Sequence, residues 1–149
     1  MKVLDLYCGA GGLSFGFEMT DAFEVVAGID NYLPALNSFY KNHICSPYFK
    51  NKYSTPTDLS SISVRKEISK DFKNIDVIVG GPPCQGFSAA GKRLDDYLND
   101  PRNHQVFNFF DIVDRLRPQA FVMENVRGIG HTGQSSKFDV LTQLQEKFN

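Results

Sequence analysis

Short apolar stretches alternate with helix-like segments along the whole chain of 149 residues. We predict strands over 2–6, 23–29, 75–79 and 120–123, with a further short strand near 52–55. Helices are predicted between and after them, over 12–19, 33–43, 62–72, 103–116 and 136–148. Strands that alternate with helices form parallel sheets with right-handed crossovers. The pattern therefore predicts one α/β domain over residues 1–149, a Rossmann-like, doubly wound, mainly parallel sheet.

Composition narrows the class of protein further. A hydrophobic content of 42% fits a globular core, and no run reaches the ~18 apolar residues of a membrane span. The net charge of −1 predicts no broad basic surface, so a nucleic-acid ligand would find most of its phosphate contacts elsewhere. The three cysteines, Cys8, Cys45 and Cys84, form neither a disulfide framework nor a metal-ligand pattern. We therefore expect a cytoplasmic protein in a reducing environment.

A cysteine follows the strand at 75–79 on a stiff turn. Residues 80–88 read Gly-Gly-Pro-Pro-Cys-Gln-Gly-Phe-Ser, with Cys84 at the centre. The two prolines force a sharp exit from the sheet, and open α/β sheets bind ligands beyond the carboxyl ends of their strands. A buried structural cysteine is the alternative, and for a lone cysteine it is the commoner one. The polar Gln85 and Ser88 favour a reactive loop.

A glycine-rich turn joins the first strand to the first helix. Residues 5–17 read Asp-Leu-Tyr-Cys-Gly-Ala-Gly-Gly-Leu-Ser-Phe-Gly-Phe. Gly9, Gly11 and Gly12 allow the backbone to turn sharply and to approach a ligand closely. Ser14 stands where a dinucleotide-binding motif has its third glycine. By itself the turn predicts a ligand-binding loop and a tight structural connection equally well.

Two aspartates at later strand ends favour the ligand-binding interpretation. Asp30 follows the second strand and suits hydrogen bonds to ribose hydroxyls, and Asp58 suits an adenine amino group. Each alone is more typical of a helix cap or a turn. Their order along the chain predicts a pocket for a nucleoside cofactor.

A carboxylate follows the strand at 120–123. The segment Glu-Asn-Val begins at Glu124, and neighbouring strands would bring Glu124 to the same sheet edge as Cys84. A thiol and a carboxyl group across one cleft permit nucleophilic attack with stabilisation of the developing charge. A loop-capping glutamate is the alternative, which the pairing with Cys84 disfavours.

Three motifs in this order closely resemble those of the C5-cytosine DNA methyltransferases. They are Asp-Leu-Tyr-Cys-Gly-Ala-Gly-Gly-Leu-Ser from Asp5, Gly-Pro-Pro-Cys-Gln-Gly-Phe-Ser from Gly81, and Glu-Asn-Val from Glu124. The resemblance covers essentially the whole chain but only the N-terminal part of that family's catalytic domain. The family's target-recognition region and later motifs do not follow, so the sheet would stop before its final strands. We therefore expect a fragment or one part of a split enzyme, completed by a C-terminal segment or subunit.

The resemblance implies S-adenosylmethionine as the cofactor. Asp30 would hold the ribose and Asp58 the adenine amino group. The implied contacts to the methionine end are Gly9, Gly11, Leu13 and Phe15, and the other implied cofactor residues are Asp5, Tyr7, Gly12, Asn31, Leu59 and Pro82. Asn31 stands where many family members have an aromatic or aliphatic residue against adenine, and Tyr32 or Ile29 could replace that contact.

The resemblance also implies the reaction, methylation of C5 of a cytosine in double-stranded DNA, as in restriction-modification systems. The Cys84 thiolate would add to C6 of a flipped-out cytosine while Glu124 hydrogen-bonds N3 and the exocyclic amine. Because a free thiol has a pKa of ~8.5, the site must favour the thiolate. Gln85, Ser88 and Asn125 complete the implied catalytic set.

The sequence leaves two questions open: whether three cations after Cys84 contact DNA, and whether the chain has another function. Lys92, Arg93 and Arg102 would meet phosphates or serve as ordinary solvated loop charges. A non-catalytic cofactor-binding subunit and an RNA cytosine-C5 methyltransferase are the alternative functions. The Gly86-Phe87-Ser88 sequence looks more like the DNA enzymes than the RNA branch.

Overall fold

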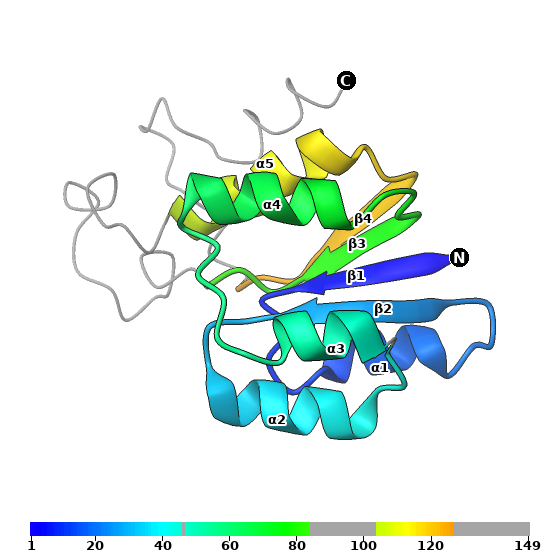
Figure 1. The fold of residues 1–149 in the computed structure, drawn as a ribbon. Helices are drawn as coiled ribbons and strands as arrows, with labels where there is room; N and C mark the ends of the chain where they lie inside the picture. The colour runs from blue at the N-terminus through cyan, green and yellow to red at the C-terminus, as the bar shows by residue number, and fades with distance from the viewer. Residues whose placement is uncertain (46, 84–103, 127–149) are drawn as a thin grey trace.

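A four-stranded parallel sheet forms the centre of the computed structural model, which describes residues 1–45, 47–83 and 104–126 (Figure 1). The strands are β1 (Lys2–Leu6), β2 (Glu24–Ile29), β3 (Val77–Gly80) and β4 (Ala120–Met123), in the order β2-β1-β3-β4. All three neighbouring pairs are parallel. The chain leaves β1 toward β2 and returns to β3 on the other side, which makes the β1–β3 boundary a topological switch point. The prediction of a Rossmann-like parallel sheet is confirmed.

Within the described residues, five helices pack around this sheet, as Figure 1 shows. They are α1 (Gly12–Glu18), α2 (Leu33–Asn42), α3 (Pro47–Tyr53), α4 (Ile62–Asp71) and α5 (His104–Leu116). The first three lie against β2, and α4 packs along α5. Val3, Leu4 and Leu6 of β1 are fully buried, as are Ile78 and Val79 of β3. Such continuous apolar strands require helices on both faces.

The segment before α4 differs from the prediction. A short strand near 52–55 is wrong, because Pro47–Tyr53 forms α3. Proline is compatible with the first turn of a helix, where its absent N–H has no partner to lose. The ring of Phe49 stacks on Phe72 with centroids 4.5 Å apart, so tertiary packing favours the helix over the turn that the local sequence indicates. The chain then passes to α4 with a backbone hydrogen bond from Thr57 N to Asp30 O at the end of β2.

The other predicted elements within the described part are confirmed to within about two residues at their ends. The helix expected over 136–148 lies outside the described residues. The strand β4 forms one edge of the described sheet, where Phe121 and Val122 are 38% and 42% exposed. Of the helices described, none has the length and apolar character to cross a membrane.

Candidate functional site

The glycine turn lies at the switch point, directly after β1. Gly9 and Gly11 both have positive φ, +54° and +89°, a conformation that favours glycine. A Cβ at Gly9 would meet no atom within 4 Å, whereas one at Gly11 would overlap Nε2 of His43. Gly9 therefore leaves its backbone open to a ligand, and Gly11 allows the turn to pack tightly on α2.

Asp30 connects this turn to the start of α2. Its Oδ2 accepts a hydrogen bond of 2.9 Å from Gly9 N, and its Oδ1 accepts one of 2.9 Å from Tyr32 N. Each carboxylate oxygen has more than one acceptor site, so a ribose contact is compatible with both bonds. The ribose role of Asp30 stays a prediction, and the observed bonds add a second role in shaping the turn.

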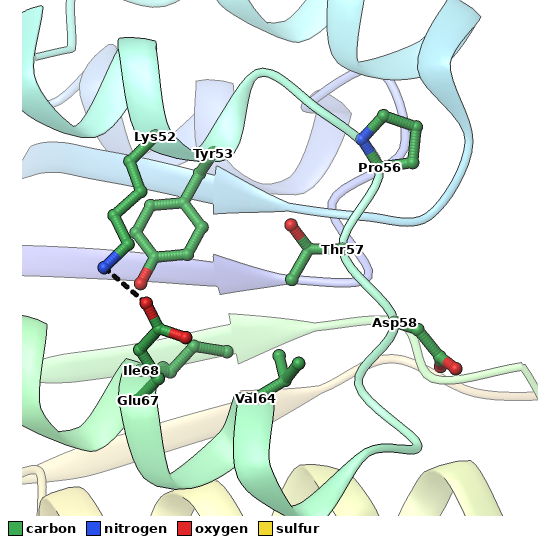
Figure 2. A pocket seen from close by; sticks show the side chains of 8 residues that line it. All are labelled: Lys52, Tyr53, Pro56, Thr57, Asp58, Val64, Glu67 and Ile68. Carbon is green, nitrogen blue, oxygen red and sulfur yellow. Dashed lines mark ion pairs between the residues drawn. The ribbon is translucent and has the colours of Figure 1, made fainter.

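Asp58 is an exposed residue at the carboxyl end of the sheet. Its two oxygens accept hydrogen bonds from Ser60 N at 2.9 Å and from Ser60 Oγ at 2.7 Å. These bonds are the main reason that the pKa of Asp58 lies below its ordinary value. Figure 2 shows its carboxylate pointing away from Lys52 and Tyr53, on the side toward which the strand arrows point. Asp58 is thus an ionised acceptor at the sheet edge where the cofactor is expected.

A cavity of about 240 Å³ lies behind Asp58, between α3 and α4 (Figure 2). Its lining consists of Lys52, Tyr53, Pro56, Thr57, Asp58, Val64, Glu67 and Ile68. The ammonium of Lys52 pairs with Glu67 at 2.8 Å and with Asp71 at 2.5 Å. These ion pairs neutralise the charges at the cavity and link α3 to α4. We therefore interpret the cavity as part of the contact between the two helices.

Asp5 is a buried acid beneath the glycine turn. It is 1% exposed, and its hydrogen-bonding neighbour is Ser14 of α1. Burial raises the pKa of Asp5 from 3.8 to about 7. Its Oδ2 is the one buried side-chain oxygen or nitrogen without a hydrogen-bond partner among the residues described. Buried acceptors without a partner are rare in native proteins, and a ligand, ion or water that donates to Oδ2 would complete this one.

His43 supports the turn from the end of α2, a role that the sequence did not indicate. Its Nδ1 lies 2.7 Å from Glu18 Oε2, and its Nε2 lies 3.2 Å from Gly11 O. The imidazole stacks on Phe39 with centroids 4.2 Å apart, and the side chain is fully buried. A lone histidine at a helix end carries no sequence signal for these contacts.

Tyr7 links the turn to α5. Its hydroxyl lies 2.9 Å from Gln105 Oε1, to which it donates a hydrogen bond, and Gln105 also accepts from Asn108 Nδ2. Burial raises the pKa of Tyr7 well above its ordinary value, so the phenol is protonated and can donate. Gln105 was not predicted as a site residue.

The carboxyl ends of β3 and β4 lie side by side. Glu124 N donates to Gly80 O at 2.9 Å, and Asn125 Nδ2 donates to Pro82 O at 3.0 Å. The predicted pairing of these two strands is confirmed. Glu124 is exposed at this edge, one residue beyond Met123, the last paired position of β4. The predicted residues Cys84, Gln85, Ser88, Lys92, Arg93 and Arg102 lie outside the described residues.

The remaining predicted cofactor residues differ in their accessibility. Phe15 is 48% exposed, Gly12 and Asn31 are exposed, and Leu13 is half-buried against the core. Pro82 is buried, and Leu59 is a core residue at 3% exposure. The exposed members are accessible to a ligand, whereas the Leu59 side chain contributes to packing.

The two described cysteines are expected to react slowly with alkylating reagents. Burial raises the pKa of the Cys45 thiol to about 12 and that of Cys8 further, so neither forms much thiolate near neutral pH. Mass spectrometry after brief treatment with iodoacetamide at pH 7.5 should find Cys8 unmodified, and Cys45 modified only slightly. Rapid modification of Cys8 in the folded chain would contradict its placement in the core.

The sheet order and the glycine turn at its switch point define a Rossmann-like α/β protein. Residues 1–149 match the family described as C-5 cytosine-specific DNA methylase, and the chain belongs to that family. This agrees with the resemblance that the three sequence motifs indicate.

Curated relatives include several type II methyltransferases. M.AgeI from Thalassovita gelatinovora is 38% identical over 132 residues, which are 87% of this chain and 28% of that protein. M.HindV from Haemophilus influenzae is 42% identical over 87% of this chain and 38% of its own length. M.HgiGI from Herpetosiphon aurantiacus is 39% identical over 85% of this chain and 90% of its own length. The chain thus spans less than two-fifths of M.AgeI and M.HindV and nearly all of M.HgiGI.

Proposed function

We propose that this chain supplies the cofactor-binding and catalytic part of a DNA (cytosine-5-)-methyltransferase. The observation that carries the proposal is the joined edge of β3 and β4, where Glu124 and Asn125 are bonded to Gly80 and Pro82. Cys84 follows Pro82 by two residues, so this edge supports a thiol and a carboxyl group at one site. Double-stranded DNA is the proposed substrate, and a complementary C-terminal segment or subunit is the proposed partner.

The residues around the glycine turn fit S-adenosylmethionine. Two features support this fit: the open space at the Gly9 backbone and the Oδ2 of Asp5, which has no hydrogen-bond partner. Asp5 would accept from the ammonium of the methionine end, Asp30 from the ribose hydroxyls and Asp58 from the adenine amino group. When bound, the cofactor supplies an electrophilic methyl group.

The proposed reaction begins at Cys84. Its thiolate forms a bond to C6 of the flipped cytosine, and electron density moves to C5. Glu124 donates a hydrogen bond to N3 and accepts one from the exocyclic amine, which stabilises the charge that the attack creates. C5 takes the methyl group as the bond from sulfur to that methyl breaks, which leaves S-adenosylhomocysteine. A base then removes the proton from C5, and the electron pair of that C–H bond expels Cys84. The cytosine ring regains its double bond, and the thiolate is restored.

Covalent trapping on duplex DNA that contains 5-fluorocytosine tests this proposal, because fluorine at C5 prevents the final elimination. With S-adenosylmethionine and a pool of duplexes of random sequence, the chain and its Cys45→Ser variant should both form a denaturation-resistant adduct. Cys84→Ser should form none, and Glu124→Gln should slow adduct formation by roughly 10²–10⁴-fold. The reaction is run with the chain alone and with the C-terminal part of a relative added.

An adduct on Cys84→Ser would remove Cys84 as the nucleophile. Cofactor binding without any adduct, even with the added segment, would contradict the catalytic role and favour the cofactor-binding subunit instead.

A further inference from the structure

Arg65 is a nearly buried cation that the proposed reaction does not use. It belongs to α4, is 8% exposed, and lies behind the turn that carries Asp58. Its Nη1 donates to the carbonyl oxygens of Leu59 and Ser60, both at 2.8 Å. Its Nε donates to Asp111 Oδ2 on α5 at 2.6 Å. One guanidinium therefore fixes two consecutive peptide groups of the turn to two helices, which Figure 1 shows packed along each other.

Asp111 anchors this arrangement. Partial burial opposes its ionisation, but hydrogen bonds from Arg115 and Arg65 outweigh that effect and hold the pKa of Asp111 below its ordinary value. Arg115 Nε donates to the same Oδ2 at 3.1 Å from one turn further along α5. Asp111 is therefore ionised at neutral pH. Arg115 offers a control, because it shares the Asp111 acceptor with Arg65.

The turn that Arg65 holds connects two proposed cofactor contacts. Ser60 donates both of its hydrogen bonds to the carboxylate of Asp58. Thr57, on the other side of Asp58, donates its N–H to Asp30 O at 2.8 Å. Because Arg65 fixes the Ser60 carbonyl and Ser60 fixes the carboxylate, the direction of the Asp58 oxygens depends on Arg65.

We propose that Arg65 is a positioning residue for adenine recognition, which fixes the 58–61 turn so that Asp58 accepts from the adenine amino group. The inference rests on the proposed function, since it requires the cofactor to bind at Asp58. Lysine cannot replace arginine here, because a single ammonium on a flexible stem does not reproduce the planar fork that reaches Asp111 and two carbonyls together.

The discrimination between two ligands tests this role. S-inosylhomocysteine carries a carbonyl oxygen where S-adenosylhomocysteine carries the amino group, so only the adenosyl ligand presents an exocyclic N–H donor to Asp58. The chain should bind S-adenosylhomocysteine at least about tenfold more tightly by calorimetry, which corresponds to one hydrogen bond to a charged acceptor. Asp58→Asn should abolish the preference, and Arg65→Lys should lower it several-fold. Arg115→Lys, the matched control, should retain it.

The results with these variants distinguish failure of the Arg65 role from failure of the proposed cofactor site. If Asp58→Asn leaves the preference intact, or if the chain binds neither ligand, the proposed cofactor site fails and the inference fails with it. If Asp58→Asn abolishes the preference and Arg65→Lys retains it, only the inference is overturned. Equal weakening of both ligands by Arg65→Lys would assign Arg65 a purely structural role.

Hydrogen exchange gives a readout that needs no ligand. Ser61 N donates to Asp58 O at 3.3 Å within the turn. Arg65→Lys should accelerate exchange of the Ser61 amide by about tenfold or more relative to Arg115→Lys, while amides of β1 keep their protection. Unchanged exchange at Ser61 would show that the turn is fixed without Arg65 and would overturn the proposal.

Discussion

Replacement of Gly80 with alanine is expected to remove a large part of the free energy of unfolding of the chain. Gly80 ends β3, opposite Leu6 of β1 and Met123 of β4. A Cβ at this position would overlap the carbonyl oxygen of Leu6 and lie 3.1 Å from Cε2 of Phe109. Leu6 is hydrogen-bonded in a central strand, so its backbone cannot move without breaking the ladder. We expect a loss of about 3 kcal/mol or more, against a typical total of 5–15 kcal/mol.

Gly16→Ala is the matched control for this substitution. Gly16 lies within α1, and an added Cβ would meet no atom within 4 Å. Because glycine is a poor helix former, alanine there should stabilise the chain by roughly 0.5–1 kcal/mol. Urea unfolding followed by circular dichroism measures both variants. A Gly80→Ala protein with the midpoint of the original chain would contradict the close approach of β3 to β1.

The strands could be predicted because their residues carry the signal locally. The run at 75–79 is apolar and is followed by Gly-Gly-Pro-Pro, and the segment at 120–123 is bounded by Pro118 and Glu124. The helix α3 could not be predicted, since Pro-Tyr-Phe-Lys-Asn-Lys-Tyr has the composition of a turn. Its stability comes from contacts such as Phe49 on Phe72, which are 23 residues apart in the printed sequence. Local propensity does not contain that information.

The candidate site shows the same division between local and distant signals. Asp30 and Glu124 could be placed because the carboxyl ends of parallel strands meet at one edge. Asp58 was expected there from a third strand that the structure replaces with α3, and the hydrogen bond from Thr57 N to Asp30 O brings it to this edge instead. The contacts that support them join distant residues: His43 to Gly11 across 32 positions, and Arg65 to Asp111 across 46. These pairs depend on how the helices cross, which is set by packing of the whole domain. The sequence therefore predicts residues for ligand contact, and it does not indicate the residues that hold them in place.

Asp5→Asn is expected to stabilise the chain at pH 8, although it removes a side chain of the proposed cofactor site. The pKa of Asp5 is about 7 in the folded chain, against an ordinary value of 3.8. Between these values the folded state binds more protons than the unfolded state, so stability falls as the pH rises through this window. The full difference corresponds to on the order of 4 kcal/mol, which is present as a penalty above pH 7.

Other acids act in a separate pH range. The pKa values of Asp71 and Asp111 lie below their ordinary values, with hydrogen bonds from Lys52 and from the two arginines outweighing burial. The stability that these two carboxylates contribute is lost only as the pH falls below about 4. The chain should therefore be most stable between about pH 4 and 6, where Asp5 is protonated and the surface pairs are intact.

Thermal unfolding between pH 4.5 and 8 measures this effect. The melting temperature of the original chain should fall across the range, whereas Asp5→Asn should show little dependence and melt several degrees higher at pH 8. Glu24→Gln removes a charge from an exposed position and should keep the slope of the original chain. A slope that persists in Asp5→Asn would assign the pH dependence to another group.

The destabilising carboxylate of Asp5 is explained if a bound cation pairs with its free oxygen. The ammonium of a bound cofactor would pair with the ionised form of Asp5 and remove the penalty, so ligand and pH should be coupled. S-adenosylhomocysteine should raise the melting temperature of the original chain more at pH 8 than at pH 5, beyond what the same ligand does for Asp5→Asn. Equal ligand stabilisation of the two proteins at both pH values would place the ammonium away from Asp5.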